Sequence, residues 1–208
     1  MNTRQRITVV TITIASLALA GTITATAAKT SAKAAQEVKA KQAAQTKIKR
    51  GQYLVTIGGC NDCHTPFKLG PNGPEPDMSR ALSGHPQDFV MPEPPKMADG
   101  KWIWAGAATN TAFAGPWGVS YARNLTPERL TGIGIWDEAM FVKTIRTGRH
   151  WGVGRPILPP MPWFNYRHAT DEDLGAIYAY LRTLKPIKNE VPEAIIAPPP
   201  PPVKTASK

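Results

Sequence analysis

Apolar residues recur at helical spacing in three stretches of the chain. The strongest pattern lies toward the C-terminus, where large apolar side chains return every three or four positions: Leu174, Ile177, Tyr178, Leu181 and Leu184. Thr170 is a suitable N-cap for this stretch, with Asp173 three residues later, and Pro186 follows its end. The pattern therefore predicts a helix that begins after Thr170 and packs one face against a core.

Two further stretches predict helices at the front and in the middle of the chain. The first runs from about Lys47 to Cys63 and carries an apolar stripe made of Tyr53, Leu54 and Ile57. The second runs from about Asp137 to Thr147, where Phe141 and Ile145 share a face and Gly148 supplies a stop.

The segment between these two helices, residues 66–135, is rich in proline, glycine and tryptophan. Its first part holds eight prolines: Pro66, Pro71, Pro74, Pro76, Pro86, Pro92, Pro94 and Pro95. Proline removes a backbone donor and fixes φ, so long helices and central strands are excluded there. The sequence predicts an all-α fold, with a few helices joined by long loops.

Cys60-Asn61-Asp62-Cys63-His64 closes the front helix, and it contains the only two cysteines of the chain. On a helix, residues i and i+3 share a face, so the two thiols can reach both vinyl groups of one porphyrin. The histidine that follows can then bind the iron. This pattern predicts one covalently attached haem c on Cys60 and Cys63, with His64 as an iron ligand.

Other chemistry for a Cys-x-x-Cys pair fits this sequence less well. A structural zinc site needs four ligands, yet the chain has no second cysteine pair, and its other histidines are scattered. A thioredoxin-like pair would accompany a βαβ pattern, which the sequence lacks. A disulfide across two residues would be strained and would constrain very little chain.

The N-terminus predicts export. Arg4 and Arg6 precede an apolar stretch, Ile7 to Ala20, and Ala25-Thr26-Ala27 offers a cleavage site of small residues. An uncleaved membrane anchor is the alternative, because residues 7–28 carry no charge over a length that can span a bilayer. Either interpretation places the folded domain in the periplasm, free or associated with the membrane through the N-terminus.

The excess of positive charge lies outside the body of the protein. The chain has 25 Lys and Arg against 15 Asp and Glu, a net charge of +10. Residues 1–50 hold nine of the basic residues and one acidic residue, whereas residues 51–202 balance at 14 of each sign. The body therefore lacks the basic patch that nucleic-acid binding requires.

These features divide the chain into four parts. Residues 1–28 are expected to be the signal peptide or signal anchor, and residues 29–46 a cationic leader rich in alanine and lysine. Residues 47–190 would form the haem domain, and residues 191–208 a proline-rich tail. About 140 residues are ample for one core around a buried cofactor.

The second iron ligand decides between function classes, because an electron carrier needs both axial positions filled. Met161 is the preferred residue: it lies between Pro160 and Pro162, which restrict the loop that would present its thioether. Met91, Met97 and His150 are the alternatives. With an open distal site, the protein would instead be a haem enzyme or a ligand sensor.

Several motifs together resemble a known family. They are Cys60-Asn61-Asp62-Cys63-His64, Asn124-Leu125-Thr126-Pro127, residues 131–136, Arg146-Thr147-Gly148-Arg149, Met161-Pro162-Trp163 and residues 171–174. Over about residues 50–190 they resemble a class I cytochrome c domain, and more closely the cytochrome c subunits that accept electrons from bacterial dehydrogenases. Many such subunits carry two or three haem motifs, whereas this chain has one.

The resemblance implies a cytochrome c-like fold with His64 as the proximal and Met161 as the distal ligand. It also implies an electron carrier rather than an enzyme, with a dehydrogenase as donor and a cytochrome or oxidase as acceptor. Trp136 and Trp163 are expected near the porphyrin, and Arg123 and Arg149 could offset the charge of its propionates.

Overall fold

A computed structural model of the chain describes residues 31–96 and 101–198. The predicted signal sequence, Met97 and the chain beyond residue 198 lie outside the described residues. The chain divides into two compact units, residues 1–46 and 47–208. Within the described ranges, no helix combines the length and the apolar character needed to cross a membrane.

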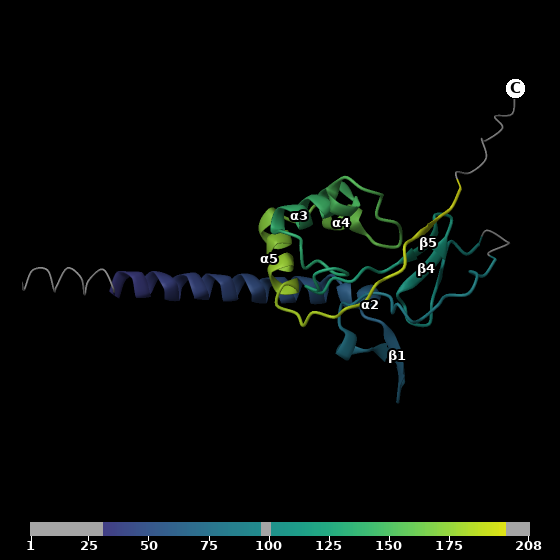
Figure 1. Ribbon diagram of the computed structural model, residues 1–208, viewed down its shortest axis with the longest axis horizontal. Helices are drawn as coiled ribbons and strands as arrows, with labels where there is room; N and C mark the ends of the chain where they lie inside the picture. Colours follow the sequence, from purple (N-terminus) through teal and green to yellow (C-terminus); the bar gives the residue numbers. More distant parts are fainter. Residues whose placement is uncertain (1–30, 97–100, 199–208) are drawn as a thin grey trace, which may run out of the picture. The chain divides into compact units, whose positions relative to one another are not determined.

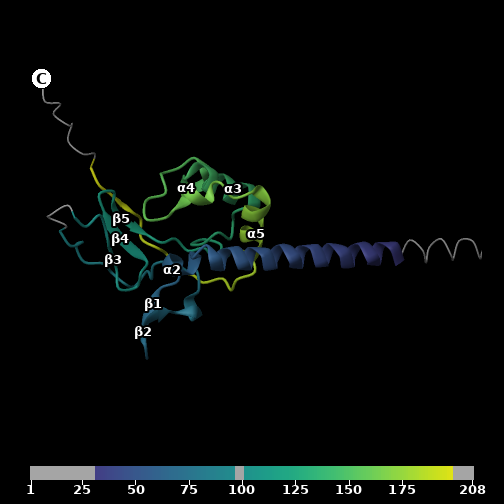
Figure 2. The ribbon, with the colours of Figure 1, turned by 180° about the vertical axis from the view of Figure 1, so that it is seen from behind.

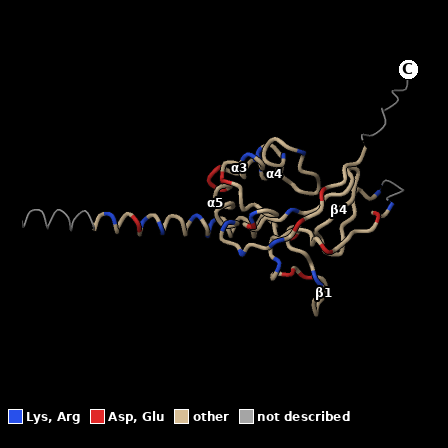
Figure 3. Tube along the Cα trace, in the orientation of Figure 1, with Lys and Arg blue, Asp and Glu red and all other residues tan. Residues whose placement is uncertain are grey.

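In the first unit, residues 31–46 are helical, and every one of them is exposed. Lysines outnumber the one acidic residue along this stretch, and Figure 3 shows the resulting run of blue positions. Val38 is the largest apolar side chain here and is 55% exposed. The leader segment therefore offers a solvated, cationic surface with little apolar area.

The second unit opens with helical residues 47–57, and four further α-helices follow within its described residues. They are α2 (Cys60–His64), α3 (Glu138–Thr147), α4 (Trp163–Tyr166) and α5 (Asp171–Leu181), with 3-10 turns at η1 (Met78–Arg80) and η2 (His150–Gly152). The predicted starts of both helices in the second half are confirmed. The Asp137 side chain accepts from the Met140 N–H at the start of α3, and Thr170 accepts from the Asp173 N–H at the start of α5.

The front helix differs from its prediction in length and in register. It ends at residue 57, and Gly59 then adopts the left-handed conformation (φ 64°) before α2 begins. Tyr53 and Ile57 of the predicted stripe are exposed, whereas Val55 is 1% exposed and enters the core. The glycine pair separates the haem motif from the helix that packs in the core.

The prediction of an all-α fold is wrong, because the structure contains two antiparallel sheets. Strands β1 (Phe67–Gly70) and β2 (Gly73–Pro76) form a hairpin. A second sheet has the order β3 (Ala105–Gly106), β4 (Ala112–Gly115), β5 (Gly118–Tyr121) and β6 (Ile195–Ile196). The prolines of β2 are tolerated because a hairpin has only edge strands. The strands of the larger sheet are too short to show a period in the sequence.

The core lies where the front helix, α3 and α5 meet. Its buried apolar residues are Val55, Leu82, Ile133, Phe141, Ile145, Leu174 and Leu181. Helices α3, α4 and α5 gather on one side of the second unit, and β4 and β5 lie on the other (Figure 1), as the reverse view confirms (Figure 2). The CxxCH helix α2 and the loops around it connect the two sides.

Gly51 allows the front helix to approach α5 closely. A Cβ at this position would overlap the carbonyl group of Ala176. Gly51→Ala is therefore expected to force the two helices apart and to lower the free energy of unfolding by about 1–3 kcal/mol. Urea unfolding measures this loss against Gln52→Ala, a change at the exposed neighbouring position. Equal stability of the two variants would contradict the close helix contact.

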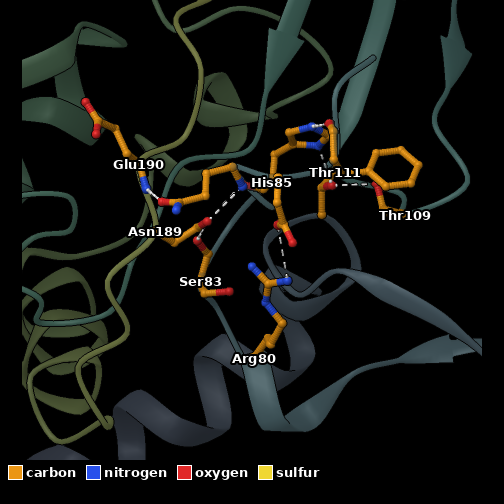
Figure 4. A network of polar contacts seen from close by, with 10 residues as sticks. Arg80, Ser83, His85, Thr109, Thr111, Asn189 and Glu190 are labelled. Atoms are coloured by element: carbon orange, nitrogen blue, oxygen red, sulfur yellow. Dashed lines mark hydrogen bonds and ion pairs between the residues drawn. The ribbon is translucent and has the colours of Figure 1, made fainter. Parts of the chain in front are cut away.

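The chain past α5 returns along the domain as a strap, which we define as residues 187–196. Figure 4 shows Asn189, near the start of this strap, with its side-chain amide donating to the backbone carbonyls of Ser83 and His85 at 2.7 and 2.8 Å. Val191 is buried, and β6 pairs with β5. The strap thus packs against the domain beyond residue 190, where the sequence pattern placed only a tail.

Candidate functional site

The two cysteines lie on the single short helix α2. Both are free thiols and both are partly buried. Burial, together with the nearby Asp62 carboxylate, raises the pKa of Cys60 to about 11, and burial also raises the pKa of Cys63. At neutral pH the pair is therefore protonated, and its sulfurs share one helix face as the spacing predicts.

Helix α2 is anchored by hydrogen bonds of Asn61, which lies between the two cysteines, and of Thr65, which directly follows the motif. The Thr65 hydroxyl donates to Asn61 Oδ1 at 2.8 Å and accepts from the Leu82 N–H at 2.9 Å. The Gly84 N–H in turn donates to the His64 carbonyl at 2.8 Å. These bonds join α2 to the loop at residues 82–84 and fix the direction in which the motif faces.

His64 is held in one tautomer. Its exposed fraction is 9%, and its Nδ1 lies 2.8 Å from the Arg123 carbonyl oxygen. A carbonyl can only accept, so Nδ1 carries the proton and the lone pair resides on Nε2. Burial also lowers the pKa of His64, which keeps the ring neutral. A buried, neutral imidazole with a committed Nδ1–H is the form that binds a metal through Nε2.

The loop of Met161 is fixed from both sides. The Ser120 hydroxyl on β5 donates to the Pro159 carbonyl at 2.6 Å, and the Trp163 N–H donates to the Met161 carbonyl at 2.9 Å. Helix α4 follows directly, and the Tyr166 hydroxyl at its end donates to the Gly58 carbonyl, two residues before Cys60. The partly buried Met161 thus belongs to a segment that is anchored beside the CxxCH motif.

Among the alternative distal ligands, Met91, Met97 and His150, the two that the structure describes differ in their surroundings. Met91 is partly buried in an irregular segment, and the Met97 alternative falls outside the described residues. The ring of His150 stacks on Trp151, with centroids 5.2 Å apart, and contacts Trp136 edge-on. The Met161 loop is the candidate whose neighbouring helix bonds directly to the CxxCH segment, through Tyr166.

A third histidine, His85, already has hydrogen-bond partners on both ring nitrogens. It is fully buried, with Nε2 2.9 Å from the Phe89 carbonyl and Nδ1 2.9 Å from the Thr111 hydroxyl. The carbonyl requires Nε2 to carry the proton, so Nδ1 accepts from Thr111. Figure 4 shows this arrangement, in which both ring nitrogens already have partners.

The two tryptophans expected near a porphyrin have structural contacts. Trp136 is partly buried beside the core, and its carbonyl accepts from the Tyr178 hydroxyl at 2.6 Å. Trp163 packs where a Cβ of Gly148 would be, and the Arg167 guanidinium lies 5.7 Å from the centre of its ring. Their place beside a porphyrin stays a prediction.

Sequence reasoning missed a charged cluster that is joined to His64 through the backbone of Arg123. Arg123, whose carbonyl holds His64, pairs through Nη1 with Glu193 at 3.2 Å, and Arg155 pairs with the same carboxylate at 3.4 Å. Arg149, the other arginine considered for propionates, donates to the Gly154 carbonyl. Nothing local in the sequence relates Glu193 to Arg123, because 70 residues separate them.

Known proteins match the greater part of this chain. It is 30% identical over 145 residues to a subunit of nicotinate dehydrogenase from Pseudomonas putida, a match that covers 70% of this chain and 9% of that protein. It is also 30% identical to the fructose dehydrogenase cytochrome subunit of Gluconobacter japonicus, over 70% of this chain and 23% of that protein. The gluconate 2-dehydrogenase cytochrome c subunit of Pantoea cypripedii is 30% identical over 67% of this chain and 23% of its own length.

The chain spans about a quarter or less of the length of these relatives. No protein-family model matches it. The matched length, 139 to 147 residues, agrees with the extent that the motifs cover. The resemblance predicted from the motifs is therefore confirmed: this chain carries a domain similar to the cytochrome c subunits of bacterial dehydrogenases.

Proposed function

We propose that this chain is a monohaem c-type cytochrome that transfers single electrons in the periplasm, from a dehydrogenase toward a downstream cytochrome or oxidase. In this assignment Cys60 and Cys63 bind the porphyrin covalently, His64 is the proximal ligand and Met161 the distal ligand. The protein itself performs no bond-making chemistry on a substrate. The cytochrome subunits among its relatives support electron transfer as the general role.

The state of His64 is the observation that carries the proposal. Its Nδ1–H is donated to the Arg123 carbonyl, and its ring is buried and neutral. The neutral ring has only one N–H, so donating it from Nδ1 leaves the Nε2 lone pair available to a metal. A proximal ligand needs that lone pair, and the Arg123 carbonyl increases the basicity of the ring by accepting from the opposite nitrogen.

The two thiols fit the same cofactor. They are free, and they lie three residues apart on one helix. The end of α2 that carries His64 is hydrogen-bonded to the loop at residues 82–84. Haem c would supply a one-electron couple at this position. The chain's residues would hold it, limit its contact with water and orient its ligands.

The Met161 loop supports a filled distal position. Its attachments at Ser120 and Trp163 leave the loop little freedom, and Tyr166 joins the following helix to the CxxCH segment. A ligand that is already restricted costs less entropy to bind, and a fixed coordination sphere reorganises little when an electron moves. This is the property that separates a carrier from an enzyme with an open site.

A dehydrogenase as electron donor is proposed by analogy with the relatives, whose names include fructose dehydrogenase and gluconate 2-dehydrogenase subunits. Export through the N-terminal signal would bring the chain to the periplasm. If the signal is cleaved near Ala27, the mature protein should begin within a few residues of Lys29. N-terminal sequencing that returned Met1 would establish the uncleaved anchor instead.

The absorption spectrum of the protein purified from a periplasm tests the proposed function. We expect one haem per chain that stays with the protein in acid acetone, with low-spin iron in both redox states. The reduced protein should bind carbon monoxide poorly, because Met161 occupies the sixth position. High-spin iron that binds carbon monoxide readily would favour a haem enzyme or sensor, and haem released into the solvent would contradict covalent attachment.

A further inference from the structure

One carboxylate on the strap bridges two arginines, of which Arg123 holds the candidate iron ligand His64 through its backbone carbonyl. Glu193 places Oε1 3.2 Å from Arg123 Nη1 and Oε2 3.4 Å from Arg155 Nε. The side chains of both arginines are about one-third exposed, whereas that of Glu193 is 72% exposed. Two partly buried cations therefore share a single, more solvated anion.

The strap is fixed on both sides of Glu193. Two residues earlier Val191 is 5% exposed, and two residues later Ile195 begins strand β6, which pairs with β5. Arg123 Nη1 also donates to the Val191 and Pro192 carbonyls at 3.2 and 3.3 Å. Glu193 is thus presented to the arginines by a backbone that has little freedom to withdraw it.

Arg123 connects this ion pair to His64. Its side chain binds the strap, while its carbonyl accepts the His64 Nδ1–H at 2.8 Å. The same cluster extends to His150, whose pKa is lowered first by burial and then by the charges of Arg123 and Arg155, with Glu193 opposing. The field in this region is therefore a balance between two guanidinium groups and one carboxylate.

We propose that Glu193 is a positioning residue for the iron centre: it neutralises Arg123 and Arg155 and secures the Arg123 backbone that holds His64. The inference rests on the proposed function and adds a residue from the C-terminal strap to the machinery of that site. It makes the reduction potential depend on a side chain that lies 129 positions after His64 in the chain.

Both consequences of losing Glu193 act in the same direction. Two uncompensated positive charges near the iron would disfavour the oxidised form, which carries one more positive charge than the reduced form. A less secure Arg123 carbonyl would weaken its bond from His64 Nδ1–H and make the imidazole a poorer donor to ferric iron. Each effect raises the reduction potential.

Redox titration of the full-length, haem-loaded protein tests this. At the midpoint potential of the unaltered protein, E193Q is expected to shift the ratio of reduced to oxidised protein by roughly two- to fivefold toward the reduced form. The shift should shrink as salt is added, because the carboxylate is exposed. E190Q is the matched control: Glu190 lies on the same strap and is anchored through its backbone N–H to Gln87 Oε1.

A second variant, R155Q, separates the effect of charge on the reduction potential from a general disturbance of the fold. R155Q removes one of the two cations and should shift the ratio toward the oxidised form, and E193Q should then have a smaller effect in the R155Q background. An E193Q protein with attached low-spin haem and an unchanged ratio would overturn the role of Glu193 while leaving the proposed function intact. An equal shift in E190Q would overturn it as well. Loss of covalent haem from the unaltered protein would instead contradict the proposed function itself.

Discussion

Replacing both Cys60 and Cys63 with alanine is expected to abolish covalent haem attachment, so that acid acetone removes all haem from any protein that accumulates. Each single replacement should leave one thioether and one unreacted vinyl group. A vinyl group extends the conjugation of the porphyrin, so the absorption band of the reduced pyridine complex should move to longer wavelength. The double variant should also be poorly folded, because the haem would be held only by its two axial ligands, His64 and Met161.

Asp62→Ala is the matched control, since Asp62 lies between the two cysteines, is exposed and carries no sulfur. It should retain covalent haem and the unshifted band. Quantifying haem per polypeptide in the three cysteine variants and in this control gives the comparison. If the double cysteine variant kept haem through acid acetone, another residue would have to be the attachment point, and the assignment of the CxxCH motif would be wrong.

Local interactions explain which parts of this fold could be predicted. Both ends of α3 and the start of α5 depend on caps within three or four residues, so Asp137, Gly148 and Thr170 are enough to place them. The CxxCH motif is equally local, because its spacing alone puts both sulfurs on one face of α2. Elements that are determined by contacts between residues close in sequence could therefore be predicted.

The features that were predicted wrongly have a common cause: they depend on contacts with segments that are distant in the sequence. Strand β6 exists because Ile195 and Ile196 pair with β5, more than 70 residues earlier, and no local pattern announces a two-residue strand. The buried face of the front helix is set by the approach of Gly51 to Ala176 and not by its largest apolar residues. The all-α prediction failed for this reason.

The candidate site shows the same division between local and distant contacts. The hydrogen bond between His64 and Arg123 joins residues 59 positions apart, and the ion pair between Arg123 and Glu193 joins residues 70 positions apart. Composition and spacing could identify His64 as a ligand candidate, yet they could not say which group would fix its tautomer. That information lies in the packing of the segment that begins at Arg123 against α2.

Met161→Ala is expected to lower the reduction potential by a substantial part of the ~0.8 V range over which axial ligands tune haem iron. A thioether is a soft, neutral ligand that favours ferrous over ferric iron, so its loss stabilises the oxidised form. The distal position should open to water, cyanide and carbon monoxide, and the weak far-red sulfur-to-iron band of the oxidised protein should vanish. The fold should survive with a loss of no more than about 3 kcal/mol, because Met161 is only partly buried.

Met91→Ala and Met97→Ala are the controls, because they remove a thioether from the alternative positions without touching the loop that Ser120 and Trp163 hold. Both should keep the far-red band and the original potential. If Met161→Ala stays low-spin with its band while Met91→Ala loses it, the ligand is Met91. If no methionine variant changes the spectrum, the iron has a different sixth ligand or an open site. His150→Ala then separates these two cases, since a histidine ligand would be lost in that variant whereas an open site would be unaffected.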